Sequence, residues 1–209
     1  MAASCMTNSG TFYINEHMRL NSRHFCLLMH KVDYDVLLLE SKFSKPRREI
    51  YSKSGTCSIV AEFDGRTLHI FYSDKTLWSN RLLQSWLRKL LKKNIIEVAE
   101  CVLPARLHYW EAQKNLKAKS VKVRKLRKNM LGVCDIDGRI ELSPKILLMP
   151  ESYMDSVILH EMAHLKYLHH RKSFWNFLTI LLGEDSNMQK VKMDIDMGIR
   201  YLYLDYILK

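Results

Sequence analysis

Residues 160–175 read HEMAHLKYLHHRKSFW, and this stretch carries more chemical information than any other part of the chain. A helix would place His160 and His164 on one face, one turn apart, where both imidazoles can bind a single zinc ion. Glu161 would then point toward the open coordination position and reach a water molecule there. Because the surrounding positions are apolar, unpaired histidines would be costly here, and metal binding offsets that cost. We therefore favour a zinc site over two buried histidines without metal.

A catalytic zinc site typically has three protein ligands and one water, so a third ligand is expected. His170 is the first candidate. On an uninterrupted helix it would lie about 9 Å along the axis from His164 and about 120° around it, so the helix must end near Leu168. The spacing equals that of the metzincin pattern, but that pattern has a glycine where this chain has Tyr167. We expect His169 to make the bend with a positive φ, and give it a smaller chance of being the ligand itself.

Glu184 is a second candidate for the third ligand. Thermolysin-type gluzincins carry a glutamate about twenty residues after the second histidine, a distance that Glu184 matches. The run Gly183-Glu184-Asp185 also reads as a polar loop that ends a helix, and we favour that interpretation. His170 is therefore preferred, with Glu184 as the alternative.

The composition is that of a globular protein with a proper core, with 47% hydrophobic and 26% charged residues in a chain of 209. Its five cysteines form no Cys-x-x-Cys pair, which favours a reduced, cytoplasmic protein. No apolar run is long enough to cross a bilayer, and the first ten residues show no secretory signal. We therefore expect a cytoplasmic protein that does not engage a membrane.

A basic segment covers residues 114–128, where eight of fifteen residues are Lys or Arg, in a chain with a formal net charge of +11. Such a segment could attract the phosphates of a nucleotide or of a nucleic acid. No pattern of stacking aromatic residues accompanies it, and charge runs are usually solvated surface. We favour the solvated surface and keep phosphate binding as the alternative.

The first half of the chain reads as β followed by α. Residues 34–40 and 56–63 have strand composition, and Asp64-Gly65 predicts a hairpin that leads into a strand at 66–72. Residues 41–55 look like a polar connection. Helices are predicted at 77–92 and 95–116, with Pro104 starting a new helix or kinking the second one.

The second half reads as two short strands followed by helices. Strands are predicted at 120–128 and 140–142, the latter after an Asp-Gly turn. Ser152 and Asp155 form a capping-box pattern that predicts the start of the helix bearing the metal site. Further helices are predicted at 172–182, ending at Gly183, and at 187–208.

Several motifs in residues 121–175 resemble the YgjP-like metallopeptidase family of small zincins. The matching runs are Gly138-Arg139-Ile140-Glu141-Leu142, Pro150, the residues 157–165, His169-His170-Arg171 and Phe174-Trp175. The resemblance implies metal ligands at His160, His164 and His170, Glu161 as the catalytic base, and His169 in the place of the family's bend asparagine. Where the family has Arg-Trp-Gly-Ser-Cys, this chain has Met130-Leu131-Gly132-Val133-Cys134, so substrate contacts made there can differ.

These observations predict an α+β fold, with an N-terminal antiparallel β-sheet region followed by a helical, zincin-like catalytic region that carries the HExxH helix. We expect an N-terminal extension over 1–45, a β-hairpin and helix region over 46–118, and the catalytic region with a C-terminal helix over 119–209.

The predicted function is a zinc-dependent metallohydrolase, favoured as a metallopeptidase that cleaves peptide bonds with metal-activated water and Glu161 as general base. The resemblance also implies an alternative, because family members have been assigned as pyrophosphatases of nucleoside triphosphates such as UTP. A third interpretation is a basic nucleic-acid-binding or interaction module with a non-catalytic metal site. A peptidase should expose a strand edge for its extended substrate, and residues 140–142 are our candidate.

Overall fold

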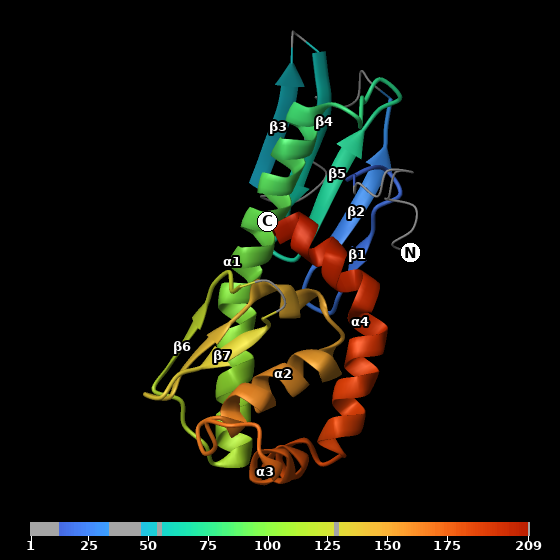
Figure 1. Cartoon of the computed structure of the whole chain (residues 1–209). Helices are drawn as coiled ribbons and strands as arrows, with labels where there is room; N and C mark the ends of the chain where they lie inside the picture. Colours follow the sequence, from blue (N-terminus) through green and yellow to red (C-terminus); the bar gives the residue numbers. More distant parts are fainter. Residues whose placement is uncertain (1–12, 34–46, 54–55, 128–129, 209) are drawn as a thin grey trace. The chain divides into compact units, whose positions relative to one another are not determined.

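The computed structural model describes residues 13–33, 47–53, 56–127 and 130–208 (Figure 1). The chain divides into two compact units, Met1–Val98 with Tyr206–Lys209, and Ala99–Asp205. The predicted α+β class is confirmed, because a sheet region precedes a mainly helical region. The three-part division predicted from the sequence stays a prediction.

Five strands of the first unit form one sheet in the order β1-β2-β5-β4-β3. Their bounds are Leu20–Asn21 (β1), Cys26–Lys31 (β2), Arg47–Lys53 (β3), Thr56–Phe63 (β4) and Thr67–Tyr72 (β5). Neighbouring strands are antiparallel except β2 and β5, which are parallel. The strands predicted at 56–63 and 66–72 are confirmed, as is the turn between them, where the Asp64 side chain accepts the backbone N–H of Arg66 and of Thr67. The strand predicted at 34–40 lies outside the described residues.

Strand β3 corrects one expectation, because the polar connection predicted over 41–55 contains it. β3 pairs antiparallel with β4 and is the last strand of the sheet. An edge strand can be rich in polar and charged residues because one of its sides stays in solvent. Backbone pairing with β4, rather than an apolar pattern, makes this segment a strand.

Helix α1 (Arg81–Lys114) is one helix where the sequence predicts two, at 77–92 and 95–116. The expected break, Pro104, lies inside it. A proline costs a helix one backbone hydrogen bond, but burial of a continuous apolar face more than offsets that loss. The fully buried members of this face include Leu87, Ile95, Ala99, Leu103 and Leu107.

The second unit contains a three-stranded sheet in the order β6-β8-β7. The strands are Ser120–Val123 (β6), Gly132–Cys134 (β7) and Arg139–Leu142 (β8). β8 is parallel to β6 and antiparallel to β7, so it is the central strand. The prediction that residues 140–142 offer a free strand edge to the substrate is therefore wrong, because this strand is paired on both sides. The edge strand next to the HExxH helix is β7, a strand that the sequence did not reveal.

Helices follow the small sheet: η3 (Pro144–Leu148), α2 (Glu151–Ala163), α3 (Lys172–Leu182) and α4 (Ser186–Leu208). The C-terminus of α3 is confirmed at Gly183, which has a φ of 77°. No helix among the described residues combines the length and apolar character that crossing a membrane requires.

The capping box predicted at Ser152 and Asp155 does not form. α2 begins directly after Pro150, and no side chain caps its first turn. Asp155 instead binds the guanidinium of Arg106 in α1 through two hydrogen bonds of 2.6 Å. Because the helix starts one residue before Ser152, this serine lies inside the first turn and is not the N-cap.

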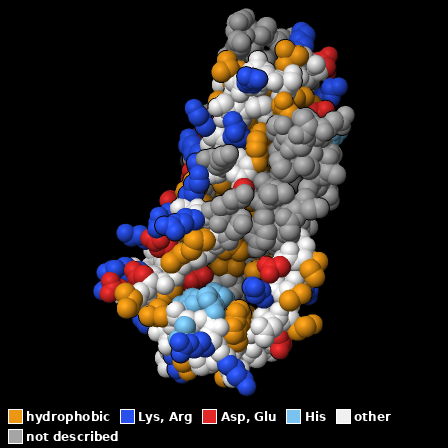
Figure 2. Space-filling view, in the orientation of Figure 1, with side chains coloured by type: hydrophobic (Ala, Val, Ile, Leu, Met, Phe, Trp, Pro, Cys, Tyr) orange, Lys and Arg blue, Asp and Glu red, His pale blue; other side chains and the backbone are white. Residues whose placement is uncertain are grey.

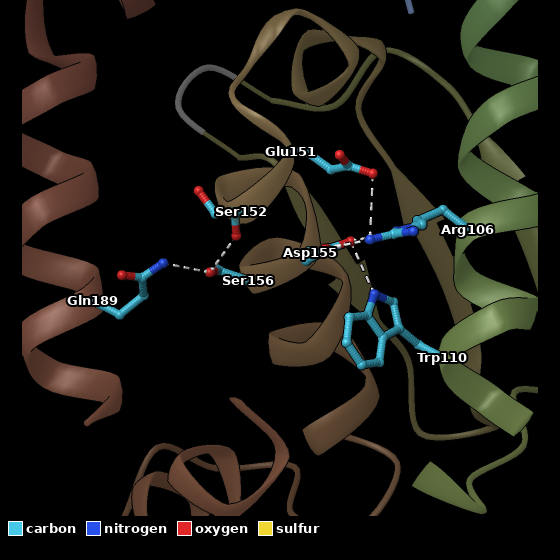
Figure 3. Close-up of polar contacts among 7 residues, drawn as sticks. All are labelled: Arg106, Trp110, Glu151, Ser152, Asp155, Ser156 and Gln189. Carbon is cyan, nitrogen blue, oxygen red and sulfur yellow. Dashed lines mark hydrogen bonds and ion pairs between the residues drawn. The ribbon is translucent and has the colours of Figure 1, made fainter. Parts of the chain in front are cut away.

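Within the second unit, α2 lies between α1 and α4 (Figures 1 and 3). Polar contacts tie it to both neighbours, to α1 through Asp155 and to α4 through Ser156, which accepts a 3.0 Å hydrogen bond from Gln189. Most of the helix is buried, including Val157, Ile158 and Met162. The HExxH segment is thus carried by a helix that is held on several sides.

Candidate metal centre

The structure brings three histidines together at the end of α2. His160 lies in the last turn, His164 is the C-cap residue, and His170 comes from the loop before α3. Their ligand atoms all lie within 4.8 Å of one another, and 3.0 Å separates Nε2 of His160 from Nε2 of His170. Zinc–nitrogen bonds of about 2.0–2.1 Å at tetrahedral angles would separate two ligand atoms by about 3.3 Å. The three residues therefore fit a zinc ion with small adjustments.

The chain reverses after α2 without the predicted bend at His169. The helix ends at Ala163, whose carbonyl accepts the N–H of Lys166 and of Tyr167, both at 3.1 Å. Among the described non-glycine residues, Asn115 alone has a positive φ, so His169 does not adopt that conformation. A run of tight turns distributes the reversal over several residues instead.

The tautomer of His164 follows from its backbone contact. Its Nδ1 lies 2.8 Å from the carbonyl oxygen of Tyr167. Because a carbonyl only accepts hydrogen bonds, the proton must be on Nδ1, which leaves Nε2 as the ligand atom. The same contact stabilises the turn that brings His170 back toward α2.

Two aromatic residues of α3 support the three imidazoles. Phe174 is completely buried, and its ring centroid lies 4.6–4.9 Å from those of all three histidines. Trp175 donates a 3.0 Å hydrogen bond from Nε1 to the carbonyl of His170. The Phe-Trp pair therefore forms an apolar floor and fixes the backbone of the third histidine.

The electrostatic surroundings favour the neutral form of His160 and His170. Burial, together with the neighbouring His164 and His170, lowers the pKa of His160 to about 3. Burial also lowers the pKa of His170, with contributions from His164, Lys190 and His169. A neutral imidazole is the form that binds a metal, so the ligands need not lose a proton near neutral pH.

Glu161 lies next to this cluster and is enclosed by strand β7. Its exposed fraction is 6%, and burial raises its pKa to about 8, although a hydrogen bond from the Cys134 backbone N–H lowers it in part. A Cβ placed on Gly132 would lie 2.5–2.7 Å from three side-chain atoms of Glu161. A glycine is therefore required at this position, because the carboxylate packs directly against the β7 backbone.

A cavity of about 270 Å³ opens beside His160 and Glu161. In Figure 2 the histidines lie at a hollow, with hydrophobic side chains around it and a basic side chain next to it. Residues from β7 and the chain before it, α2, α3 and α4 line the cavity: Met130, Leu131, Gly132, Ser156, Val157, His160, Glu161, Trp175, Leu178, Leu182, Ser186, Gln189, Lys190, Met193 and Asp194. The candidate metal centre thus borders a cavity that a ligand can enter.

Comparison with known proteins identifies the family. The YgjP-like metallopeptidase domain matches residues 55–191. The chain belongs to the YgjP-like metallopeptidase family. No curated protein matches it. Among solved structures, the crystal structure of the metallopeptidase zymogen of Pyrococcus abyssi abylysin is similar, with 22% sequence identity, a TM-score of 0.40, and coverage of 46% of this chain and 96% of that chain.

The family predicted from residues 121–175 is therefore confirmed, and with it the coarse assignment as a metallopeptidase. The alternative third ligand, Glu184, is exposed and does not belong to the histidine group. The described part of the basic segment, residues 114–127, contributes no residue to the cavity. Two of its members pair with carboxylates, Lys117 with Glu111 and Arg124 with Glu141. The structure thus offers no support for phosphate binding at this site.

The HExxH helix of this YgjP-like chain is anchored by a polar network that sequence reasoning missed (Figure 3). Asp155 accepts two hydrogen bonds from Arg106 and a third, of 2.9 Å, from Nε1 of Trp110. Glu151 lies 3.4 Å from the same guanidinium. Only the capping-box pattern drew attention to Asp155, and it suggested a different role.

Proposed function

We propose that the chain is a zinc-dependent metallopeptidase in which His160, His164 and His170 bind the metal and Glu161 is the general base. The observation that carries the proposal is the convergence of three imidazoles beside a buried carboxylate at an open cavity. Three protein ligands would leave a bound zinc ion open to water or substrate, as in catalytic zinc sites.

A bound zinc ion supplies Lewis-acid chemistry, since it makes a water molecule more acidic and polarises a carbonyl group. Glu161 accepts a proton from the attacking water on its carboxylate and later delivers it to the leaving amine nitrogen. Burial favours this role, because a raised pKa lets the carboxylate accept and return a proton near neutral pH. The Cys134 N–H and the absence of a side chain at Gly132 hold the carboxylate in place.

The edge of β7 supports an extended peptide as the substrate. The backbone N–H of Asp135 donates to the carbonyl of Arg139, and the carbonyl of Leu131 accepts the N–H of Ser143, so both groups point toward the β8 side of the sheet. In an antiparallel ladder the direction of these groups alternates, so the backbone of Gly132 points away from β8, toward the cavity that it lines. A substrate strand can pair there, beside the metal centre.

We also retain a cytoplasmic location as part of the proposal, on the basis of the cysteine pattern.

Exchange of Glu161 for Gln tests the proposal. We expect Glu161→Gln to abolish hydrolysis of fluorescent casein while the chain retains one equivalent of zinc. Glu184→Gln is the matched control, because this exposed glutamate was the alternative ligand, and it should change neither zinc content nor rate. UTP hydrolysis should be measured in parallel. Turnover of UTP, but not of casein, by the native chain would contradict the proposal.

A further inference from the structure

Helix α4 brings one cation, Lys190, to the wall of the metal-site cavity. The preceding residue, Gln189, is 7% exposed and donates a 3.0 Å hydrogen bond to Oγ of Ser156 in α2. Ser156 in turn donates to the carbonyl of Ser152 at 2.7 Å (Figure 3). This buried contact fixes the position of Lys190 relative to the helix that carries His160 and Glu161.

His160, Glu161 and Lys190 line the same cavity. His160 and Glu161 belong to α2, whereas Lys190 belongs to α4. The lysine and the general base therefore reach the cavity from different helices.

A divalent cation bound by the three histidines would repel a lysine beside it unless an anion lay between them. The carboxylate paired with Lys190 is Asp194, at 3.9 Å on the same helix, and both side chains are more than half exposed. Such an exposed pair is weak and easily broken. The other carboxylate among the described residues that line the cavity is Glu161, which the proposed mechanism uses as the general base. A substrate would bring further negative charge to the cavity.

We propose that Lys190 binds the carbonyl oxygen of the scissile peptide bond and stabilises the negative charge that develops on it. The proposal rests on the proposed peptidase function. Water attacks the carbonyl carbon and gives its proton to Glu161, while the electron pair of the C=O π bond moves to the oxygen that faces Lys190. When that pair returns, the C–N bond breaks, and the amine nitrogen receives the proton from Glu161. The ground-state carbonyl lacks this charge, which develops in the transition state that leads to the tetrahedral intermediate, so the lysine acts on kcat more than on KM.

Lys190→Met tests the proposal, because methionine keeps the length of the side chain without its charge. Steady-state kinetics would use a quenched peptide built on a bond that the native chain cleaves in casein. We expect kcat to fall by about 10²–10³-fold with KM changed by less than about threefold. Lys190→Arg should recover part of the rate, since the charge is kept. Lys192→Met is the matched control, because Lys192 is exposed on the same helix and does not line the cavity, and it should match the native chain.

Two further readouts do not depend on turnover. A phosphinic analogue of the same peptide mimics the charged tetrahedral state, and its Kd measured by calorimetry should rise in parallel with the fall in kcat for Lys190→Met. Zinc affinity, measured by chelator competition, should be equal to or tighter than that of the native chain, because a repelling charge is removed. Weaker zinc binding would instead show a structural role and overturn the proposal.

The outcomes separate this proposal from the proposed function. If the native chain cleaves the peptide and Lys190→Met retains its kcat, Lys190 is not catalytic, although the peptidase assignment stands. A raised KM with unchanged kcat would make Lys190 a binder of substrate carboxylates and overturn its role at the oxyanion. If the native chain binds zinc but cleaves neither casein nor peptides, the proposed function itself fails, and the role of Lys190 fails with it.

Discussion

Gly132→Ala should damage both the stability of the chain and its active site, because a new methyl group would collide with Glu161. The added Cβ would lie 2.5 Å from Cγ and 2.6 Å from Oε1 of that residue. Carbon atoms in contact need about 3.5 Å, so either the carboxylate or strand β7 must move by about 1 Å. Overpacking of this kind costs about 1–3 kcal/mol. A displacement of about 1 Å at a reacting group can cost about 10²-fold in rate.

A double-mutant cycle isolates this collision from other effects. Urea denaturation of the metal-free chain would give the free energy of unfolding for the native chain, Gly132→Ala, Glu161→Ala and the double variant. In the Glu161→Ala background the methyl group has room, and replacing glycine then stabilises by up to about 1 kcal/mol through the unfolded chain. We therefore expect Gly132→Ala to change from destabilising to neutral or stabilising. An equal cost in both backgrounds would refute the close packing of β7 against Glu161.

Other predictions concern the second unit. Asp155→Ala should lower the free energy of unfolding by about 2–4 kcal/mol, because it leaves the partly buried guanidinium of Arg106 without its main partner. Glu151→Ala should cost less than about 1 kcal/mol. Equal effects of the two substitutions in urea denaturation would contradict the Arg106 anchor. Burial would raise the pKa of Glu111, but hydrogen bonds from His108, the Ala118 N–H and Lys117 bring it below the ordinary 4.5. The contribution of this carboxylate to the free energy of unfolding is therefore present above pH 4.5 and is lost as the pH falls through the lowered pKa. The stability difference between metal-free native chain and Glu111→Gln should therefore narrow in acid, and a constant difference between pH 7 and pH 3 would argue against this carboxylate contact. Phe174→Ala should lower the free energy of unfolding by about 3–5 kcal/mol, because this ring is completely buried. It should also weaken zinc binding, measured by chelator competition, because the ring contacts all three imidazoles. Unchanged zinc affinity would contradict the role of Phe174 in positioning the histidines.

Local chemistry made much of the fold and site predictable. Helical spacing placed His160 and His164 on one face, and the Asp64-Gly65 turn marked the β4–β5 hairpin. The choice of His170 over Glu184 needed family resemblance as well as spacing, since no periodic pattern crosses a chain reversal. The helix of His160 and His164 and the β4–β5 turn were predictable because residues close in sequence determine them.

The features that sequence reasoning missed depend on distant contacts. β7 has only three residues and exists because β8 pairs with it, and α1 passes through Pro104 because its apolar face is buried on both sides of it. Lys190 follows Glu161 by 29 positions and lies on a helix whose place is set by packing against α2. No local signal marks such residues, so only the folded chain brings them to the site.

X-ray absorption at the zinc edge tests the central claim most directly. For the native chain loaded with one equivalent of zinc, we expect three imidazole nitrogens and one oxygen at about 2.0–2.1 Å. In His170→Ala, one imidazole should disappear from the spectrum and zinc affinity should fall by at least about 100-fold, more than the loss of an outer partner usually costs. A spectrum with four protein ligands, or one unchanged by His170→Ala, would contradict the three-histidine centre.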